Sequence, residues 1–264
     1  EILPSDWSSD VCSSDLGSKW VGLQWFERFF TAPNFWRMLK NTVLLSFFSL
    51  LWGFPVPIIL ALMINQLRFK RFQRFVQTVL YAPHFISIMV ICGMIRIFLS
   101  PSGGLINLIT QSNTDYLSHA SAFRTIYIAS GIWQDAGWGI IVYMATLANI
   151  DVSQYEAAKI DGASLLQRIR HIDIPELMPT IMLMLIMSAG SLMNVGFEKV
   201  WLLQTNLNKA TSDVISVYVY QQGIENAKYS YSTAVGLFNT VANIILLIVV
   251  NRVASRMSDN VRFV

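Results

Sequence analysis

Residues 139–164 read GIIVYMATLANIDVSQYEAAKIDGAS, an apolar run that leads directly into a short charged segment with a glycine near its end. With the residues before it, the apolar part is long enough to cross a bilayer, whose hydrocarbon core of about 30 Å takes roughly 20 helical residues. The charged part, YEAAKIDGAS at residues 155–164, is typical of a helix and a turn in water. The stretch therefore predicts a membrane-spanning helix followed by a structured loop.

The composition of the whole chain is that of a membrane protein. Of its 264 residues, 54% are hydrophobic and 13% are charged, and the mean hydropathy is +0.48. A water-soluble domain of this size needs more charge to cover its surface. Two cysteines, Cys12 and Cys92, are too few for a disulfide framework or a zinc cluster. We expect an all-α fold, a polytopic bundle of membrane helices.

Five segments have the length and apolar character of a membrane span. They are residues 41–64, 76–99, 123–150, 177–195 and 233–250, and the fourth is compatible with an extension to about Leu203. Pro55 and Pro57 lie inside the first segment, where neighbouring helices re-satisfy the carbonyl groups that proline leaves free. We expect one membrane domain over residues 17–264.

Basic residues set the orientation of these spans, because short cytoplasmic loops are rich in Lys and Arg. Three groups of basic residues mark the predicted cytoplasmic loops: Arg68, Lys70, Arg71 and Arg74; Lys159, Arg168 and Arg170; and Arg252, Arg256 and Arg262. The other basic residues are spread over residues 17–40, 96–124 and 199–228, which we expect outside. The chain therefore starts outside and ends inside.

The segment LRFKRFQRF at residues 67–75 alternates basic and aromatic residues. In a soluble protein this pattern suggests a nucleic-acid patch. Its position between two spans favours an interfacial elbow, with Lys and Arg reaching for water and Phe69, Phe72 and Phe75 buried.

Residues 1–16 contain the triplet SSD twice and have neither the basic nor the apolar region of a signal peptide. We interpret them as a non-native, linker-like tail and exclude them from the fold prediction. A genuine flexible tail is the alternative.

The predicted cytoplasmic loop, residues 151–176, has the signals of two short helices. Ser153 and Glu156 have the spacing of a capping box, and Gly162 accepts the left-handed conformation that ends a helix. Ser164 is expected to cap a second helix, which Pro175 ends. The apolar face of this helix consists of Leu165, Leu166, Ile169 and Ile172. Such a pair forms a rigid projection for a groove on a partner or, alternatively, lies on the membrane surface.

The loop resembles the EAA signature of permease subunits of ABC importers. The spacing is Glu156-Ala157-Ala158, three residues, Gly162, nine residues, Ile172, one residue and Ile174-Pro175, with Ile174 where leucine is usual. In that family the loop is a coupling helix that docks into a cleft of the ATPase subunit. The resemblance implies that the ATPase-coupling residues are Glu156, Ala157, Ala158, Asp161, Gly162, Ile172 and Pro175.

The resemblance covers Lys19 to Val264 and is strongest to the carbohydrate-uptake permeases of the polysaccharide and oligosaccharide branch. It includes the stretches NQLRFKRFQRFVQTVLYAPHFIS and LMNVGFEKVWLLQ. It implies the fold of a type I ABC importer permease in a bacterial cytoplasmic membrane, where six spans are usual, so that a first helix is missing here. The implied partners are a second permease subunit, an ABC ATPase dimer, an extracytoplasmic solute-binding protein, a sugar and membrane lipid, with no nucleic acid.

No nucleotide-binding or hydrolase motif occurs in the sequence, neither GxxxxGK[ST] nor HExxH nor GxSxG. We therefore expect a transport subunit and not an enzyme. The chain is expected to carry no cofactor, with ATP and Mg²⁺ bound by the partner ATPase. His84, His119 and His171 have no metal-ligand spacing, so no metal site is predicted.

Polar groups inside spans are candidates for the translocation path, because they are costly in lipid. The candidates are Asp135, Asn194, Glu198 and Asn239, with Gln134 and Asn243 beside them and Trp138, Trp133 and Tyr143 for stacking on sugar rings. Hydrogen bonds between helices are the alternative for the polar residues, and the interfacial belt or bundle packing for the aromatic ones. Residues 188–191, SAGS, predict close helix packing, or an unwound helix along the path.

Two further classes of function remain open on the residues alone. A stand-alone channel or an ion-coupled carrier would need charge pairs buried in its spans and would have no use for the capped cytoplasmic loop. A non-transporting membrane scaffold would use the loop to recruit another protein.

Overall fold

The computed structural model describes residues 21–257, with side chains up to residue 252, and residues 1–16 lie outside this range. No strand occurs between residues 21 and 257, which confirms the all-α prediction. The helices are α2 (Gln24–Phe30), α3 (Phe35–Gly53), α4 (Pro55–Asn65), α5 (Lys70–Tyr81), η1 (Ala82–Phe85), α6 (Ile88–Phe98), α7 (Leu105–Thr110), α8 (Ala120–Ala148), α9 (Val152–Ile160), α10 (Leu165–Arg168), η2 (Ile169–Asp173), α11 (Ile174–Gly190), α12 (Phe197–Leu203), α13 (Lys209–Ser212), α14 (Ile215–Tyr220), η3 (Gln221–Glu225) and α15 (Tyr229–Met257).

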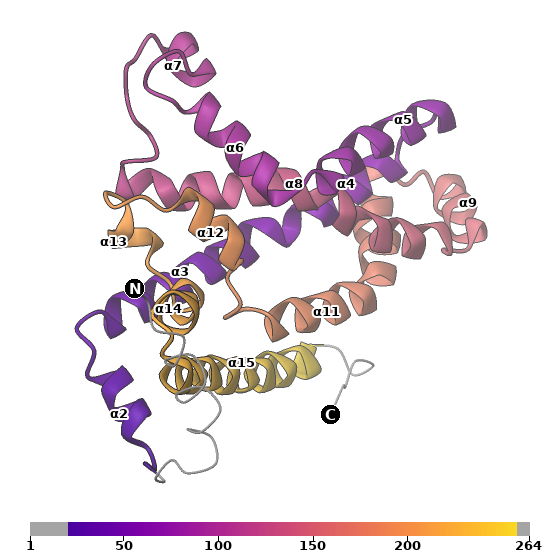
Figure 1. Cartoon of the computed structure of the whole chain (residues 1–264). Helices are drawn as coiled ribbons and strands as arrows, with labels where there is room; N and C mark the ends of the chain where they lie inside the picture. Colours follow the sequence, from indigo (N-terminus) through magenta and orange to yellow (C-terminus); the bar gives the residue numbers. More distant parts are fainter. Residues whose placement is uncertain (1–20, 258–264) are drawn as a thin grey trace, which may run out of the picture.

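The 29-residue helix α8 is the central element of the bundle (Figure 1). It contacts α3, α4, α5, α11 and α13, and α15 packs on the far side of α11. Near its start, Phe123 lies in an apolar cluster with Leu203 and Val214. Near its end, Ile140 and Leu147 lie in a second cluster with residues of α4 and α11. The two ends of α8 are therefore held by separate cores.

Three of the described helical segments are long and apolar enough to cross a membrane: Phe35–Asn65, Leu165–Gly190 and Tyr229–Arg252. A fourth is obtained if α5–η1 and α6 together form one broken span. Helix α8 matches the third predicted span in position, but Gln134 and Asp135 lower its hydropathy. By length and composition, the described residues thus contain three membrane spans, or four with the broken one, where the sequence predicts five.

The first predicted span consists of α3 and α4, which follow each other at Pro55. Pro55 occupies the first turn of α4, where a missing N–H costs no helical hydrogen bond. The N–H of Phe54 still reaches the carbonyl of Leu50, at 2.9 Å. The span thus accommodates Pro55 by starting a new helix there, and the predicted re-satisfaction of the freed carbonyl groups by neighbouring helices stays a prediction.

The second predicted span, residues 76–99, is not one helix. The helices on either side of residues 86–87 are bent by 94° to each other. Pro83 lies in the short 3-10 turn η1, and the hydroxyl of Ser87 accepts a hydrogen bond from the N–H of Val90 and so starts α6. The proline and the new helix cap that follows it explain why the helix is interrupted within this apolar stretch.

The fourth predicted span ends at Gly190, and its extension to Leu203 is wrong. After Gly190 the chain leaves the helix, and the N–H of Met193 donates to Asn243 Oδ1 at 2.8 Å. A Cβ atom on Gly190 would lie 2.9 Å from Leu247 Cδ1 of α15, which confirms the close packing predicted for residues 188–191. The unwound stretch that follows also agrees with the alternative interpretation.

The aromatic residues of the predicted elbow are not buried within this chain. Helix α5 has no buried residue, and Phe69, Phe72 and Phe75 are 77%, 52% and 64% exposed. The described elements leave these side chains exposed, and their predicted burial in the membrane interface stays a prediction.

The close approach of α5 to α8 gives a first prediction. A Cβ atom on Gly137 would lie 1.9 Å from the carbonyl oxygen of Leu80, so Gly137→Ala forces the two helices apart. Overpacking of this kind costs about 1–3 kcal/mol. Gly93→Ala is the matched control, since no atom lies within 4 Å of its Cβ position. We expect a lower thermal unfolding temperature in detergent for Gly137→Ala only, and equal temperatures for the two variants would contradict this packing.

Candidate functional site

Helix α9 projects from the bundle at the end of α8 (Figure 1). Glu156, Ala157, Asp161 and Gly162, four of the predicted coupling residues, are exposed, and Ala158 is half-buried. Apolar side chains on the same projection are unusually open: Val152 is 65%, Ile160 86% and Leu166 74% exposed. Exposed apolar groups gathered on one projection are typical of a docking surface.

The helix caps of this projection agree only in part with the predictions. Gly162 has a φ of +73°, the left-handed conformation expected at the end of α9. Ser164 caps α10 and forms a capping box with Gln167. The capping box predicted at Ser153 is wrong, because α9 starts at Val152 and the carboxylate of Asp151 accepts the hydrogen bond from the N–H of Ser153.

Pro175 does not end the second helix, and that prediction is also wrong. The chain widens into the π-helical turn η2, in which the N–H of Ile174 bonds to the carbonyl of Ile169, and it then continues as α11. Pro175 lies in the first turn of α11, where no N–H is needed. A continuous helical segment therefore connects the projection to the membrane bundle.

The predicted apolar face of the second helix is divided between two environments. Ile172 is buried in a cluster with Ile64 and Leu147, whereas Leu165 and Leu166 are exposed. Tyr155 of α9 is half-buried against the same cluster. The projection thus has an inner side that packs on the bundle and an outer side that the other described elements leave exposed.

The sequence analysis missed Asp173, the last residue of η2. Its carboxylate is fully buried and accepts hydrogen bonds from the hydroxyl of Tyr155 and from Gln66 Nε2, the latter at 3.0 Å. Burial, and then the adjacent carboxylate, raise the pKa of Tyr155 above its usual value, so the phenol stays protonated and acts as the donor. A carboxylate among apolar residues of the loop was the only signal in the sequence.

A cavity of about 440 Å³ borders the middle of α8. Gln134, Asp135 and Tyr143, three of the predicted path residues, line it. Trp138 does not line this cavity; it stacks on His84 with 4.5 Å between the ring centroids. His84 Nδ1 in turn lies 3.1 Å from Asp135 Oδ1, so Trp138 adjoins the cavity through His84.

Asn194 lines a smaller cavity of about 160 Å³, which shares Tyr127 and Ser188 with the larger one. Asn239 Nδ2 donates to Asn194 Oδ1 at 3.3 Å, so these two predicted residues lie together. Glu198 is exposed and lines neither cavity. The two adjoining cavities are therefore lined by Gln134, Asp135, Tyr143 and Asn194. Trp138 and Asn239 lie beside these residues, and Glu198 lies apart.

Of the remaining candidates, Asn243 of α15 accepts a hydrogen bond from the backbone N–H of Met193 in the unwound stretch after α11, and Trp133 is 50% exposed. Lys199 lines the larger cavity and was missed. It is buried, and its Nζ donates to the carbonyl of Tyr127 at 3.0 Å. A lysine inside the apolar stretch VGFEKVWLL was the signal that could have identified it.

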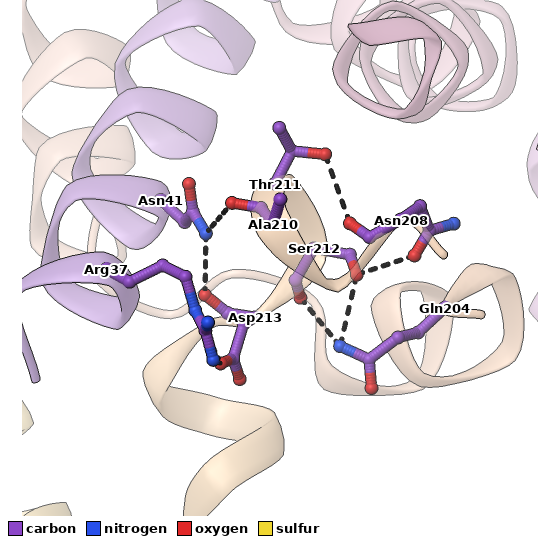
Figure 2. A network of polar contacts seen from close by, with 8 residues as sticks. All are labelled: Arg37, Asn41, Gln204, Asn208, Ala210, Thr211, Ser212 and Asp213. Atoms are coloured by element: carbon purple, nitrogen blue, oxygen red, sulfur yellow. Dashed lines mark hydrogen bonds and ion pairs between the residues drawn. The ribbon is translucent and has the colours of Figure 1, made fainter. Parts of the chain in front are cut away.

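A network of polar contacts lies at the other end of α8 (Figure 2). Arg37 of α3 forms an ion pair of 2.6 Å with Asp213. Thr211 of α13 donates to the carbonyl of Ala120, the first residue of α8, at 2.6 Å, and Asn208 is fully buried. The network fastens the segment around α13 to both α3 and α8.

Among residues 21–257, no group of three His, Cys, Asp or Glu side chains is placed to hold a metal ion. The polar contacts described above are ion pairs between side chains, and hydrogen bonds among side chains and backbone groups.

Comparison with known proteins identifies the family of the chain. The family model for inner-membrane components of binding-protein-dependent transport systems matches residues 29–259. Protein LplB of Bacillus subtilis (strain 168) is 42% identical over 246 residues, which are 92% of this chain and 77% of that protein. The polygalacturonan/rhamnogalacturonan transport system permease protein YteP of the same strain is 40% identical over 248 residues, with the same two coverages of 92% and 77%.

The fold is similar to that of a solved transporter. A chain in the crystal structure of a bacterial alginate ABC transporter, in complex with a periplasmic protein that holds an alginate pentasaccharide, superposes with a TM-score of 0.87 at 41% identity. The match covers 90% of this chain and 84% of that chain. The protein belongs to the family of binding-protein-dependent transport system inner membrane components, and it is a membrane-embedded permease subunit of an ABC importer.

Proposed function

We propose that this permease carries oligosaccharides or fragments of polysaccharides across a bacterial cytoplasmic membrane into the cell. The names of its relatives support a sugar cargo, since one is a polygalacturonan/rhamnogalacturonan transport permease and another belongs to an alginate transporter. A stand-alone channel, an ion-coupled carrier or a membrane scaffold does not account for membership of this family. The observation that carries the proposal is the exposed, capped projection formed by α9, which bears the EAA sequence at the end of the central helix.

We propose that the exposed side of α9 docks into an ABC ATPase dimer. Glu156, Ala157 and Gly162 belong to this side, and the small alanine side chain allows another surface to approach closely. The open apolar residues Ile160 and Leu166 would lose contact with water on docking. ATP and Mg²⁺ are then bound by the partner, and this chain contributes no cofactor of its own.

The translocation path is proposed to include the two adjoining cavities beside α8. The lining of the larger cavity includes a neutral amide (Gln134), an acidic group (Asp135) and a basic group (Lys199), all able to form hydrogen bonds. It also includes the aromatic rings of Tyr127 and Tyr143. Sugars present many hydroxyl groups and apolar ring faces, and such a lining complements both. The path is completed, in this proposal, by a second permease subunit on the open side of the cavities.

The remaining partner is an extracytoplasmic solute-binding protein. We propose that it docks at the end of α8 opposite α9, where the polar network of Figure 2 holds the segment around α13. This assignment follows the predicted orientation, in which residues 96–124 and 199–228 lie outside.

Site-directed cross-linking tests the docking of α9. In a chain with Cys12→Ser and Cys92→Ala, a photoreactive maleimide is attached to Ala157→Cys or to the control Ser102→Cys, both at exposed positions. After co-expression with its partner ABC ATPase, we expect an ATPase adduct from position 157 and none from position 102. An adduct from position 102, or none from 157 in a purified complex, contradicts the proposed docking.

The glycine corner after α9 gives a second test of coupling. Gly162→Ala places a side chain in open space but at a φ of +73°, which costs about 1–2 kcal/mol. Gly162→Asn is the matched control, since Asn tolerates this conformation far better. We expect sugar uptake to fall more with Ala than with Asn. Equal uptake by the two variants would show that coupling does not depend on this corner.

A further inference from the structure

We propose that Tyr155, Asp173 and Gln66 form a polar latch that makes α9, the π-helical turn η2 and the end of α4 move as one body. The latch would transmit the motion of the ATPase from α9 to the helices that line the cavity. This inference rests on the coupling role proposed above for α9. None of the three residues belongs to the EAA signature as it stands in this sequence.

The latch joins three separate elements at one carboxylate. Tyr155 comes from α9, Asp173 is the last residue of η2, and Gln66 directly follows α4. The Tyr155 hydroxyl donates to Oδ1 of Asp173, and Gln66 Nε2 donates to Oδ2 at 3.0 Å. Each carboxylate oxygen therefore has its own donor, one from α9 and one from the residue that follows α4.

The burial of the carboxylate makes these hydrogen bonds costly to break. Asp173 has no exposed surface, so water cannot replace a lost donor unless the surrounding side chains also separate. A buried carboxylate without its hydrogen bonds is strongly unfavourable. Moving α9 away from η2 would remove the Tyr155 donor, and η2 must therefore follow α9.

The covalent links of α9 to the bundle are poorly suited to this transmission. Residues 149–151 connect it to α8 without helical structure, and Gly162 connects it to α10 through a left-handed corner. Both links permit bending, which would absorb a displacement of α9. A direct contact between α9 and η2 bypasses them.

The two elements beyond the latch both reach the cavity. Helix α11 continues from η2 and contributes Met184 and Ser188 to the cavity lining. Helix α4, which ends just before Gln66, contributes Pro57. Figure 1 shows α4 and α11 running back from the end at which α9 projects. A displacement at Asp173 is thereby conveyed to two walls of the proposed path.

A nearby contact serves as the matched control. Gln154 Nε2, one residue before Tyr155, donates to Glu176 Oε1 of α11 at 3.3 Å, and this bond is exposed. It connects α9 to the same segment, but water can replace it at little cost. If any polar link from α9 sufficed, loss of the Gln154 contact and loss of the Tyr155 contact would have similar effects.

The experiment uses the full transporter, with both permeases, the ATPase and the binding protein, reconstituted in liposomes. The variants are Tyr155→Phe, Gln66→Leu, the double variant and the control Gln154→Leu. Co-purification of the ATPase, basal ATP hydrolysis and sugar transported per ATP are measured. We expect Tyr155→Phe to keep the ATPase and its basal hydrolysis but to transport severalfold less sugar per ATP. The control is expected to match the wild type, and the double variant to be little worse than either single variant.

The outcomes separate the latch from the proposed function. If Tyr155→Phe transports as much sugar per ATP as the wild type, Tyr155 is dispensable and the latch is overturned. If this variant no longer binds the ATPase, Tyr155 is part of the docking surface, which also overturns the latch. An equal defect in Gln154→Leu also overturns it. If the wild-type chain itself brings down no ATPase, the proposed function fails before the latch is addressed.

Discussion

The structure depends on the need of every backbone N–H and C=O group in a lipid environment to find a partner within the protein. Unbroken helices meet this need by themselves, and an interrupted helix needs help from elsewhere. Three interruptions here have such help. Ser87 accepts the N–H of Val90 where α6 begins, Asn243 accepts the N–H of Met193 after α11, and the π-helical turn η2 closes its own hydrogen bond ahead of Pro175.

These interruptions lie where the functional features are found. The larger cavity is bordered by Gly53 and Phe54, where α3 passes into α4, and by Gly196, just before α12. The turn η2 supplies the carboxylate that holds α9. A break in a helix frees a position from the regular spacing of side chains, and this allows a polar group to be turned toward a cavity or a neighbouring helix. The places that are costly for folding are thus the places where the proposed path and the proposed coupling contacts lie.

Local signals in the sequence were sufficient for much of this architecture. The apolar runs identify the helices, Gly162 and Ser164 identify the corner after α9, and Asp135 is recognisable as a polar group inside a span. The features that were missed depend on residues far apart in the chain. Asp173 meets Gln66 across 107 positions, and Lys199 is buried against Tyr127 across 72. The capping box at Ser153 failed for a local reason, because Asp151 is a competing cap two residues earlier.

The distribution of polar contacts along α8 suits a protein that transmits a conformational change from one end of a helix bundle to the other. At one end the carboxylate of Asp173 has two donors and no exposure, and at the other end Asn208 is fully buried within its own network. Between them, beside the cavities, buried and exposed contacts occur together. Lys199 is buried and donates to the carbonyl of Tyr127. The contacts of Asp135 with His84 and of Asn239 with Asn194 are exposed. Exposed contacts are exchanged at little cost, whereas buried networks resist deformation. Such a bundle can rearrange the exposed contacts beside its cavities, while the buried networks at the two ends of α8 keep the surfaces proposed for its partners intact.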